Sequence, residues 1–189
     1  MSRPVTARTM KQRGFTLVEL LIVVIILAIL AAIVIPQFSG ATTDTREAAL
    51  DSNLGGLRNA IELYKAQHST YPAGVATTGG SCAATKGTGA INSGQAFIDH
   101  LLMYSDASGN TCSVGDTTTF KYGPYIRKGV PTDAVTGKGG VAADIVVTSA
   151  GSPLAPAAAT GGWAYDSKSG QVVMNSNGTD SKAAAYSTH

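Results

Sequence analysis

The feature that most restricts how this chain can fold is an apolar run close to its N-terminus. The run extends from Phe15 to Ile35, and its only polar side chains are Thr16 and Glu19. At about 1.5 Å per residue the run makes a helix of roughly 31 Å, which matches the hydrocarbon core of a bilayer. It therefore predicts a membrane-spanning helix, because the buried helix of a soluble protein is rarely so long and so uniformly apolar.

The residues before this run predict its orientation. They include four basic side chains and no acidic one, namely Arg3, Arg8, Lys11 and Arg13. By the positive-inside rule the N-terminus lies in the cytoplasm and the rest of the chain lies outside. An ordinary secretory signal has a shorter apolar core and no acid, so it fits less well. Two alternatives stay open: secretion after a cut near Ser39-Gly40-Ala41, and an uncut signal anchor.

Glu19 needs an explanation of its own. A carboxylate within a membrane span costs about 2.5 to 3.5 kcal/mol on insertion scales, so it is presumed functional and expected to have a basic partner. No Lys, Arg or His lies between Phe15 and Thr45. The nearest candidate is the α-amino group that a cut between Gly14 and Phe15 creates, one helical turn from Glu19. In an assembly this pair can form between neighbouring subunits.

The sequence GFTLVE at residues 14–19, followed by the apolar run and Pro36, resembles the leader junction of type IV pilins and of the pseudopilins of type II secretion. Counted from Phe15, Glu19 is the fifth residue and Pro36 the twenty-second, as in that family. The resemblance implies cleavage after Gly14 by a prepilin peptidase and N-methylation of Phe15. It also implies a filament of packed N-terminal helices, in which Glu19 neutralises the terminus of a neighbouring subunit and Pro36 belongs to the assembly segment.

The resemblance further implies the partners and the location. The partners are other copies of the chain, minor pilins or pseudopilins, the prepilin peptidase, an inner-membrane assembly platform and membrane lipid. The precursor is then a single-pass protein of the inner membrane with a periplasmic or extracellular head, and after cleavage it enters the filament.

The charge balance argues against a nucleic-acid partner. The full chain has fourteen basic and twelve acidic side chains. All the acidic residues follow Gly14 and four basic ones precede it, so cleavage leaves ten basic against twelve acidic side chains. The basic pI therefore belongs to the precursor, and the remaining chain lacks the basic cluster that phosphate binding needs.

Residues 44–68 predict an amphipathic continuation of the N-terminal helix. Apolar side chains recur at intervals of three and four residues, at Leu50, Leu54, Leu57, Ile61 and Tyr64. Gly55-Gly56 interrupts the helix, which implies a close approach or a bend there, and loosening is also expected near Pro36 and Gly40. The helix is expected to stop before Tyr71-Pro72.

From Ala73 onward the chain predicts a β-rich head with long loops, because eighteen of the 22 glycines lie here. The fold class is α+β and pilin-like, with the second half of the long helix packed on a small antiparallel sheet. The expected elements are a short helix at 95–104, strands at 119–122, 144–148, 162–166 and 171–175, and loops at 74–94 and 149–161. The last two strands form a hairpin through Ser167–Gly170.

This pattern divides the chain into four parts. Residues 1–14 are the cleaved basic leader, and residues 15–38 are the transmembrane and filament-core helix. Residues 39–68 continue that helix, and residues 69–189 form the extracytoplasmic head.

The two cysteines, Cys82 and Cys112, both follow the membrane span and predict a disulfide in an oxidising compartment. A zinc site made of these two and His100 is the alternative, although the spacing matches no zinc signature. Each of the three histidines, His68, His100 and His189, is expected to be a helix cap, a surface group or part of a tail.

No cofactor is expected, with calcium as one possible exception. Heads of pseudopilin-like proteins often hold calcium, and Asp133, Asp144 and Asp180 are carboxylates of the corresponding region by resemblance. The segment Asp106–Asn110 resembles the opening of a calcium loop but lacks the glycine and the glutamate that complete one, so a solvated turn is expected.

No catalytic constellation is present, so the chain is not expected to be an enzyme. The segments 123–131, 162–166 and 170–172 are similar to the heads of pseudopilin-like proteins. The predicted function is therefore a filament subunit, specifically a pseudopilin of type II secretion. A type IV pilin for adhesion, twitching or DNA uptake is the first alternative, and an anchored or secreted extracytoplasmic enzyme is the second.

Overall fold

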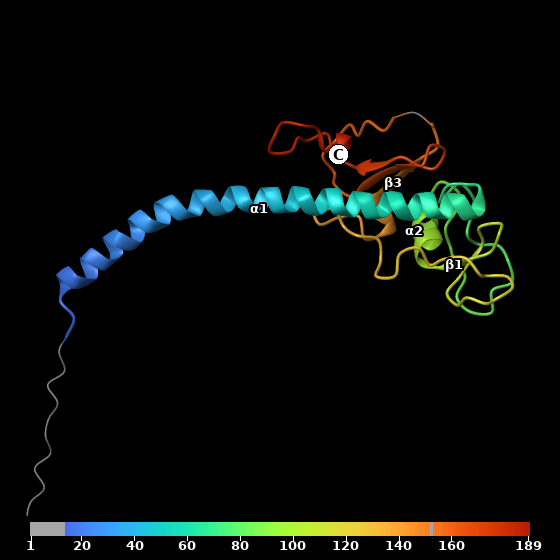
Figure 1. Ribbon diagram of the computed structural model, residues 1–189, viewed down its shortest axis with the longest axis horizontal. Helices are drawn as coiled ribbons and strands as arrows, with labels where there is room; N and C mark the ends of the chain where they lie inside the picture. Colours follow the sequence, from blue (N-terminus) through green and yellow to red (C-terminus); the bar gives the residue numbers. More distant parts are fainter. Residues whose placement is uncertain (1–13, 152) are drawn as a thin grey trace, which may run out of the picture. The chain divides into compact units, whose positions relative to one another are not determined.

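A computed structural model describes residues 14–151 and 153–189, apart from the side chains of residues 35–39. The chain divides into two compact units, with the boundary between Thr42 and Thr43. The helix α1 (Leu17–His68) contributes its first part to one unit and its last part to the other. The remaining elements all belong to the second unit (Figure 1).

Helix α1 ends where the sequence predicts. Its last residue is His68, and the next residue, Ser69, has a left-handed backbone with φ of 57°. The Nζ atom of Lys65 donates a hydrogen bond of 2.7 Å to the Ser69 carbonyl oxygen, so a cation lies at the negative end of the helix. Pro36 lies within α1, but its side chain is outside the described residues, so its predicted place in assembly stays a prediction.

The core of the second unit forms on the apolar stripe of α1. All five predicted stripe residues have no exposed surface: Leu50, Leu54, Leu57, Ile61 and Tyr64. Four of them, Leu50, Leu54, Leu57 and Ile61, pack in one cluster with Phe97 and Leu101 of α2 and with Trp163, Tyr165, Val172 and Met174 of the sheet. The prediction that this stripe belongs to the core is confirmed. The stripe is the side of α1 on which the rest of the second unit packs.

The short helix α2 (Gly94–Leu102) confirms the predicted helix except at its end. Its N-cap is Ser93, whose Oγ accepts a hydrogen bond of 3.1 Å from the backbone N–H of Ala96. The prediction extended the helix to Tyr104, whereas Met103 is already extended and Tyr104 begins strand β1. Tyr104, which the amphipathic pattern assigned to the helix, therefore pairs with β2 instead.

The main sheet has three strands in the order β3 (Ile145–Thr148), β4 (Trp163–Asp166) and β5 (Val172–Met174). Strands β4 and β5 form the predicted antiparallel hairpin, with Trp163 opposite Met174. Strand β3 is parallel to β4, so the expectation of a purely antiparallel sheet is wrong for this pair. The loop at 149–161 explains the difference, because it is long enough to carry the chain back to the start of the neighbouring strand.

A second, two-stranded sheet was not predicted. It consists of β1 (Tyr104–Ser105) and β2 (Thr111–Cys112), which are antiparallel. The strand predicted at 119–122 is wrong, since only Tyr122 makes a bridge there, opposite Ser105. The carboxylate of Asp116 accepts hydrogen bonds from the backbone N–H groups that follow it, including that of Phe120, and holds this segment in a turn.

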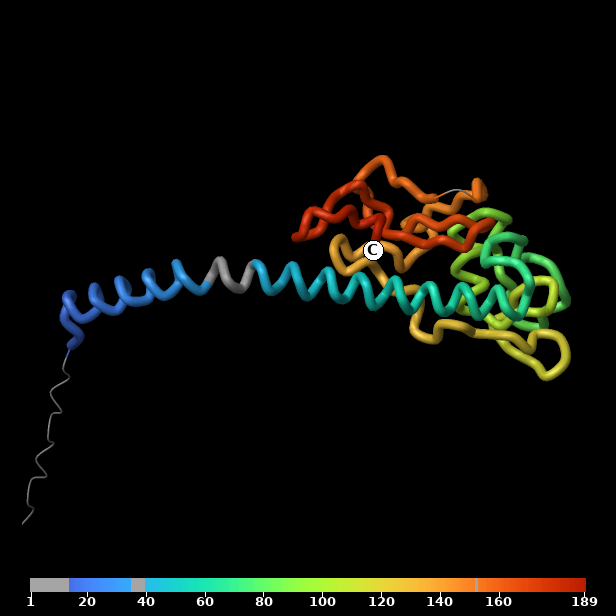
Figure 2. The backbone as a smooth tube through the Cα atoms, turned by 45° about the horizontal axis from the view of Figure 1, so that its top comes forward, coloured from blue at the N-terminus to red at the C-terminus, as the bar shows by residue number. Residues whose placement is uncertain are grey.

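Two 3₁₀ turns and a C-terminal segment complete the second unit. The turns are η1 (Ala142–Asp144), which leads into β3, and η2 (Tyr186–Thr188) near the C-terminus. The last residues lie beside α1 (Figure 2), where Nδ1 of His189 is 2.7 Å from Oδ1 of Asp51. The backbone N–H of Ser181 also donates to Glu47 at 2.7 Å, so α1 holds both ends of this segment.

Candidate functional site

The candidate site is the start of α1, where the sequence places a cleavage point and an assembly residue. Residues 14–16 precede the helix and are not helical. Gly14 is exposed, and Phe15 retains 84% of its accessible surface. The bond between Gly14 and Phe15 therefore lies in accessible, non-helical backbone immediately before α1.

Thr16 and Glu19 form a capping box at this helix start. The Oε2 atom of Glu19 accepts hydrogen bonds from the backbone N–H of Thr16 at 2.9 Å and from the Thr16 hydroxyl at 2.8 Å. In return, the Thr16 hydroxyl oxygen accepts from the backbone N–H of Glu19 at 3.2 Å. This reciprocal pattern satisfies donors that a helix N-terminus otherwise leaves unpaired.

The capping box changes the interpretation of Glu19. The sequence analysis considered only a basic partner, whereas the structure gives this carboxylate a neutral partner within its own chain. The signal was present in the sequence, because Thr16-Leu-Val-Glu19 has the spacing of a capping box. The cap uses atoms of Thr16 and none of Gly14 or Phe15, so a cut between those two residues leaves it intact.

The carboxylate of Glu19 keeps room for a further partner. Oε2 makes both capping bonds, and within residues 14–151 and 153–189 the other oxygen, Oε1, accepts none. A carboxylate offers about four lone-pair sites, so one more donor can bind without breaking the cap. An amino group from another molecule is a suitable donor.

The side chains around the site form an uncovered apolar surface. Every described side chain from Phe15 to Val34 is exposed. The segment Leu17–Val34 is long and apolar enough to cross a membrane. Apolar surface of this extent on all sides of a helix is stable only when lipid or other protein covers it.

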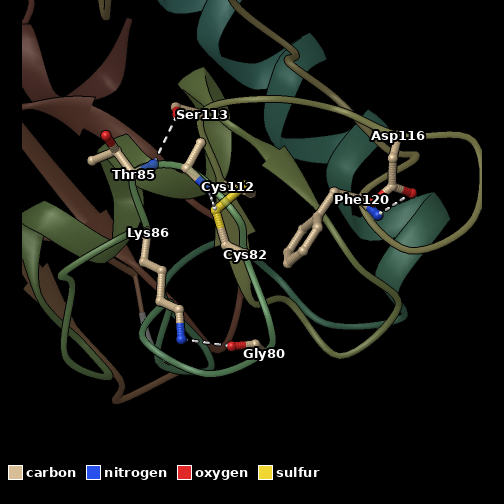
Figure 3. The surroundings of a disulfide bond; sticks show 9 residues. Gly80, Cys82, Thr85, Lys86, Cys112, Ser113, Asp116 and Phe120 are labelled. Atoms are coloured by element: carbon tan, nitrogen blue, oxygen red, sulfur yellow. Dashed lines mark hydrogen bonds between the residues drawn. A yellow bond between two sulfur atoms is a disulfide. The ribbon is translucent and has the colours of Figure 1, made fainter.

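The predicted disulfide is present in the head. Cys82 and Cys112 are bonded, with their Cα atoms 5.5 Å apart. The bond joins the loop at 74–94 to β2, and beside it the backbone N–H of Thr85 donates a hydrogen bond of 3.2 Å to the Ser113 Oγ (Figure 3). The alternative of a zinc site with His100 is wrong, because both sulfur atoms are used in the disulfide.

Two histidines are buried. For His100 this contradicts the expectation of a cap or a surface group, whereas the His68 ring lies at the end of α1 with its Nδ1 3.2 Å from the Tyr64 carbonyl oxygen. His100 has no exposed surface; its Nδ1 accepts from the Ala73 N–H at 2.8 Å, and its Nε2 lies 2.9 Å from the Gly109 carbonyl oxygen. Burial lowers the pKa of His100 to about 4. His68 stacks on Tyr64, and burial lowers its pKa as well. Both rings are therefore packed in the core, and their burial favours the neutral form.

The three carboxylates considered for calcium have other partners. Asp133 accepts from the Gly162 N–H at 2.8 Å, Asp144 from the Gly139 N–H at 3.1 Å, and Asp180 from the Ala184 N–H at 2.7 Å. No group of three or more His, Cys, Asp or Glu side chains is placed to hold a metal in the part of the chain that the structure describes. Asp106 confirms the predicted turn, since its carboxylate accepts from the N–H groups of Ser108 and Asn110.

Comparison with known proteins agrees with the candidate site. The prokaryotic N-terminal methylation motif matches residues 9–35. Over 62 residues the chain is 39% identical to type II secretion system core protein G of Klebsiella pneumoniae. The matched region is 33% of this chain and 44% of that protein. The protein of the same name from Escherichia coli is 38% identical over 64 residues, covering 34% of this chain and 44% of the relative. That from Vibrio cholerae is 40% identical over 62 residues, covering 33% and 42%.

These matches have a limited extent. The chain matches less than half the length of each of these relatives. No solved structure matches the chain significantly. The comparisons thus support the N-terminal segment, where the methylation motif lies, and cover about a third of the chain.

Proposed function

We propose that this chain is a structural subunit of a type II secretion filament, a pseudopilin rather than an enzyme. In this proposal the precursor spans the inner membrane with its leader in the cytoplasm and its head outside. A prepilin peptidase cuts between Gly14 and Phe15, and the new terminus is methylated. Copies then leave the membrane and pack through their N-terminal helices, together with minor pseudopilins and an assembly platform.

The observation that carries the proposal is the uncovered apolar surface from Phe15 to Val34. Lipid covers it in the precursor, and the same surfaces of other copies cover it in the filament. The methylation motif at residues 9–35 and the similarity to type II secretion system core protein G support the same order of events.

Glu19 has a defined role in this mechanism. Its Oε2 atom caps its own helix through Thr16, and its Oε1 atom receives the amino group of Phe15 from a neighbouring copy. This pair neutralises the charge of a carboxylate that otherwise stays without a counter-charge in an apolar environment, which is costly. The pairing also sets the position of one subunit relative to the next.

The test is the mature N-terminus, measured by mass spectrometry on protein from cell envelopes. The proposal expects a chain that starts at a methylated Phe15 and is recovered in sheared or detergent-resistant filaments. Export of a secreted protein should stop when the chain is deleted. An intact Met1, or a start near Thr42, contradicts the proposal, and filaments with unaffected export favour a type IV pilin.

A further inference from the structure

A groove runs beside α1 in the second unit. It has a volume of about 390 Å³ and lies between the helix face at Ser52 to Leu57 and the loop at 125–131. The loop runs beside α1 in the tube view (Figure 2). The Nδ2 atom of Asn53 donates a hydrogen bond of 2.9 Å to the Thr132 carbonyl oxygen and holds the loop against the helix. We call this surface the α1 groove.

The floor of the α1 groove includes the bare backbone of Gly56. A glycine within a helix costs about 1 kcal/mol relative to alanine. A Cβ atom added at Gly55 or at Gly56 would meet no heavy atom within 4 Å. The close approach that the sequence predicted at these glycines is therefore not made by the described part of the chain, and the groove is open to a second molecule.

The rim of the α1 groove is basic. Arg127 and Lys128 both line it and are exposed. Neither makes an ion pair within residues 14–151 and 153–189, and no carboxylate is among the described residues that line the groove. An acidic occupant therefore matches this surface.

The same unit carries a matching acidic surface on the preceding turns of α1. Asp44, Ala48 and Asp51 share one helix face, at intervals of four and three residues, and line a separate depression. We call this surface the acidic face. Asp44 is exposed, and the Asp51 side chain is 57% exposed although it contacts His189. The small Ala48 between the two carboxylates permits a close approach, while Lys182 and His189 border the face.

We propose that the α1 groove of one copy receives the acidic face of a second copy of this chain. The two surfaces are different, and Asp51 and Asp44 lie five and twelve residues before Gly56, which is roughly 8 to 18 Å along the helix. A contact between different surfaces shifted along an axis does not close on itself, so repetition gives an open filament. This inference rests on the proposed function, since it names the head contact of that filament.

Charge reversal tests the contact. Arg127→Glu with Lys128→Glu places acid against acid and should reduce sheared filaments at least tenfold. Asp44→Lys with Asp51→Lys should do the same, and the chain with all four substitutions should regain filaments because the charges are complementary again. Lys121→Glu with Lys168→Glu is the matched control, since it makes an equal change of charge at exposed sites outside the groove.

Bulk at the groove floor gives a second test that does not depend on charge. A Cβ at Gly56 meets no heavy atom within 4 Å, and leucine is a better helix former than glycine, so Gly56→Leu should keep or raise the temperature of thermal unfolding while filaments are lost. Ala66→Leu adds comparable bulk at another exposed position of α1 and should assemble normally. In wild-type filaments a carbodiimide should join Lys128 of one copy to Asp44 or Asp51 of another, as mass spectrometry of mixed isotope-labelled copies will show.

The outcomes separate this contact from the proposed function. Normal filaments from the Arg127→Glu and Lys128→Glu chain, or from Gly56→Leu, overturn the contact and leave the filament proposal standing. Failure of the fourfold variant to regain filaments also overturns the pairing of these two surfaces. If the wild-type chain itself is never found in filaments, the proposed function is overturned and the contact with it.

Discussion

The side chains of Thr16 and Glu19 close on each other across the first turn of α1, with the carboxylate 2.8 Å from the hydroxyl and 2.9 Å from the backbone nitrogen. An acid within an apolar span therefore has a structural use in the isolated chain. Its second oxygen remains open toward another molecule. These two uses predict different results for substitutions at the two positions.

Substitutions at Thr16 and Glu19 separate capping from assembly. Glu19→Ala should leave the chain inserted in the membrane and lower filament yield by at least about tenfold, because the charge pair with the neighbouring amino group is lost. Thr16→Val removes the capping hydroxyl but keeps the carboxylate, so filaments should form. Yields are measured on sheared fractions against total protein. Equal losses from both variants would show that Glu19 acts only as a cap.

Replacing Gly14 should block processing. Gly14→Leu meets no atom within 4 Å of its Cβ, so the chain itself accommodates the new side chain. The effect expected is an uncut precursor on a gel, because the substituted residue precedes the cleaved bond. Gly40→Leu is the control, since Gly40 also has open space and lies far along α1. Normal maturation of the Gly14 variant would place the cut elsewhere.

The disulfide should stabilise the head. The bond between Cys82 and Cys112 spans 30 residues of sequence, and closing a loop of that length is worth roughly 3 to 4 kcal/mol in the chain-entropy description. The double variant Cys82→Ser with Cys112→Ser should lose about that much free energy of unfolding. Urea unfolding of the full chain in detergent, followed by the fluorescence of the buried Trp163, measures it.

The control for this measurement is a reducing agent. It should destabilise the wild-type chain by a similar amount and leave the double serine variant unchanged. A wild-type chain that is insensitive to complete reduction would show that the disulfide contributes little to stability.

Periodic patterns in the sequence predicted those elements whose structure depends only on the spacing of nearby residues. The stripe from Leu50 to Tyr64 and the alternation around Ser167–Gly170 require only local spacing, and both are confirmed. The parallel pairing of β3 with β4 was missed because it depends on the path of a thirteen-residue loop, which has no periodic signal. The Thr16–Glu19 cap was readable from its spacing and was overlooked.

The burial of His100 could not be read from its neighbours in sequence. Its two ring nitrogens are satisfied by the backbone of Ala73 and of Gly109, which tertiary structure brings to the ring from both directions along the chain. The same is true of Asp133, whose carboxylate accepts from the Gly162 N–H. Polar side chains of this kind look like surface groups until the contacts across the fold are known.

His100 predicts a loss of stability in mild acid. Burial lowers its pKa from 6.5 to about 4, so between these values the unfolded chain binds a proton that the folded chain does not. The free energy of unfolding should therefore be greatest above pH 6.5 and fall by about 3 kcal/mol as the pH decreases to 4. Urea unfolding at a series of pH values measures the slope.

The variant His100→Gln identifies the source of this slope. It should be less stable than wild type at pH 7 and less dependent on pH between 6.5 and 4, with the remaining slope due in part to His68. Asp166 contributes little to this slope. Although partial desolvation raises its pKa, hydrogen bonds from Ser169 and Gly151 lower it from 3.8 to about 2, so most of its own contribution is lost below pH 4. An unchanged slope in the variant would contradict the assignment.

Two tyrosines with no exposed surface allow the contribution of one buried hydrogen bond to stability to be measured. The hydroxyl of Tyr165 donates to the Pro72 carbonyl oxygen at 3.0 Å, whereas the buried hydroxyl of Tyr64 has no partner among the described residues. Tyr165→Phe should lower the free energy of unfolding by about 1 kcal/mol, since it leaves a buried acceptor unpaired. Tyr64→Phe should leave the free energy of unfolding unchanged or raise it, because the substitution removes a buried hydroxyl that makes no hydrogen bond. Parallel urea unfolding compares the two, and an equal cost at both positions would show that the Tyr64 hydroxyl is hydrogen-bonded in solution.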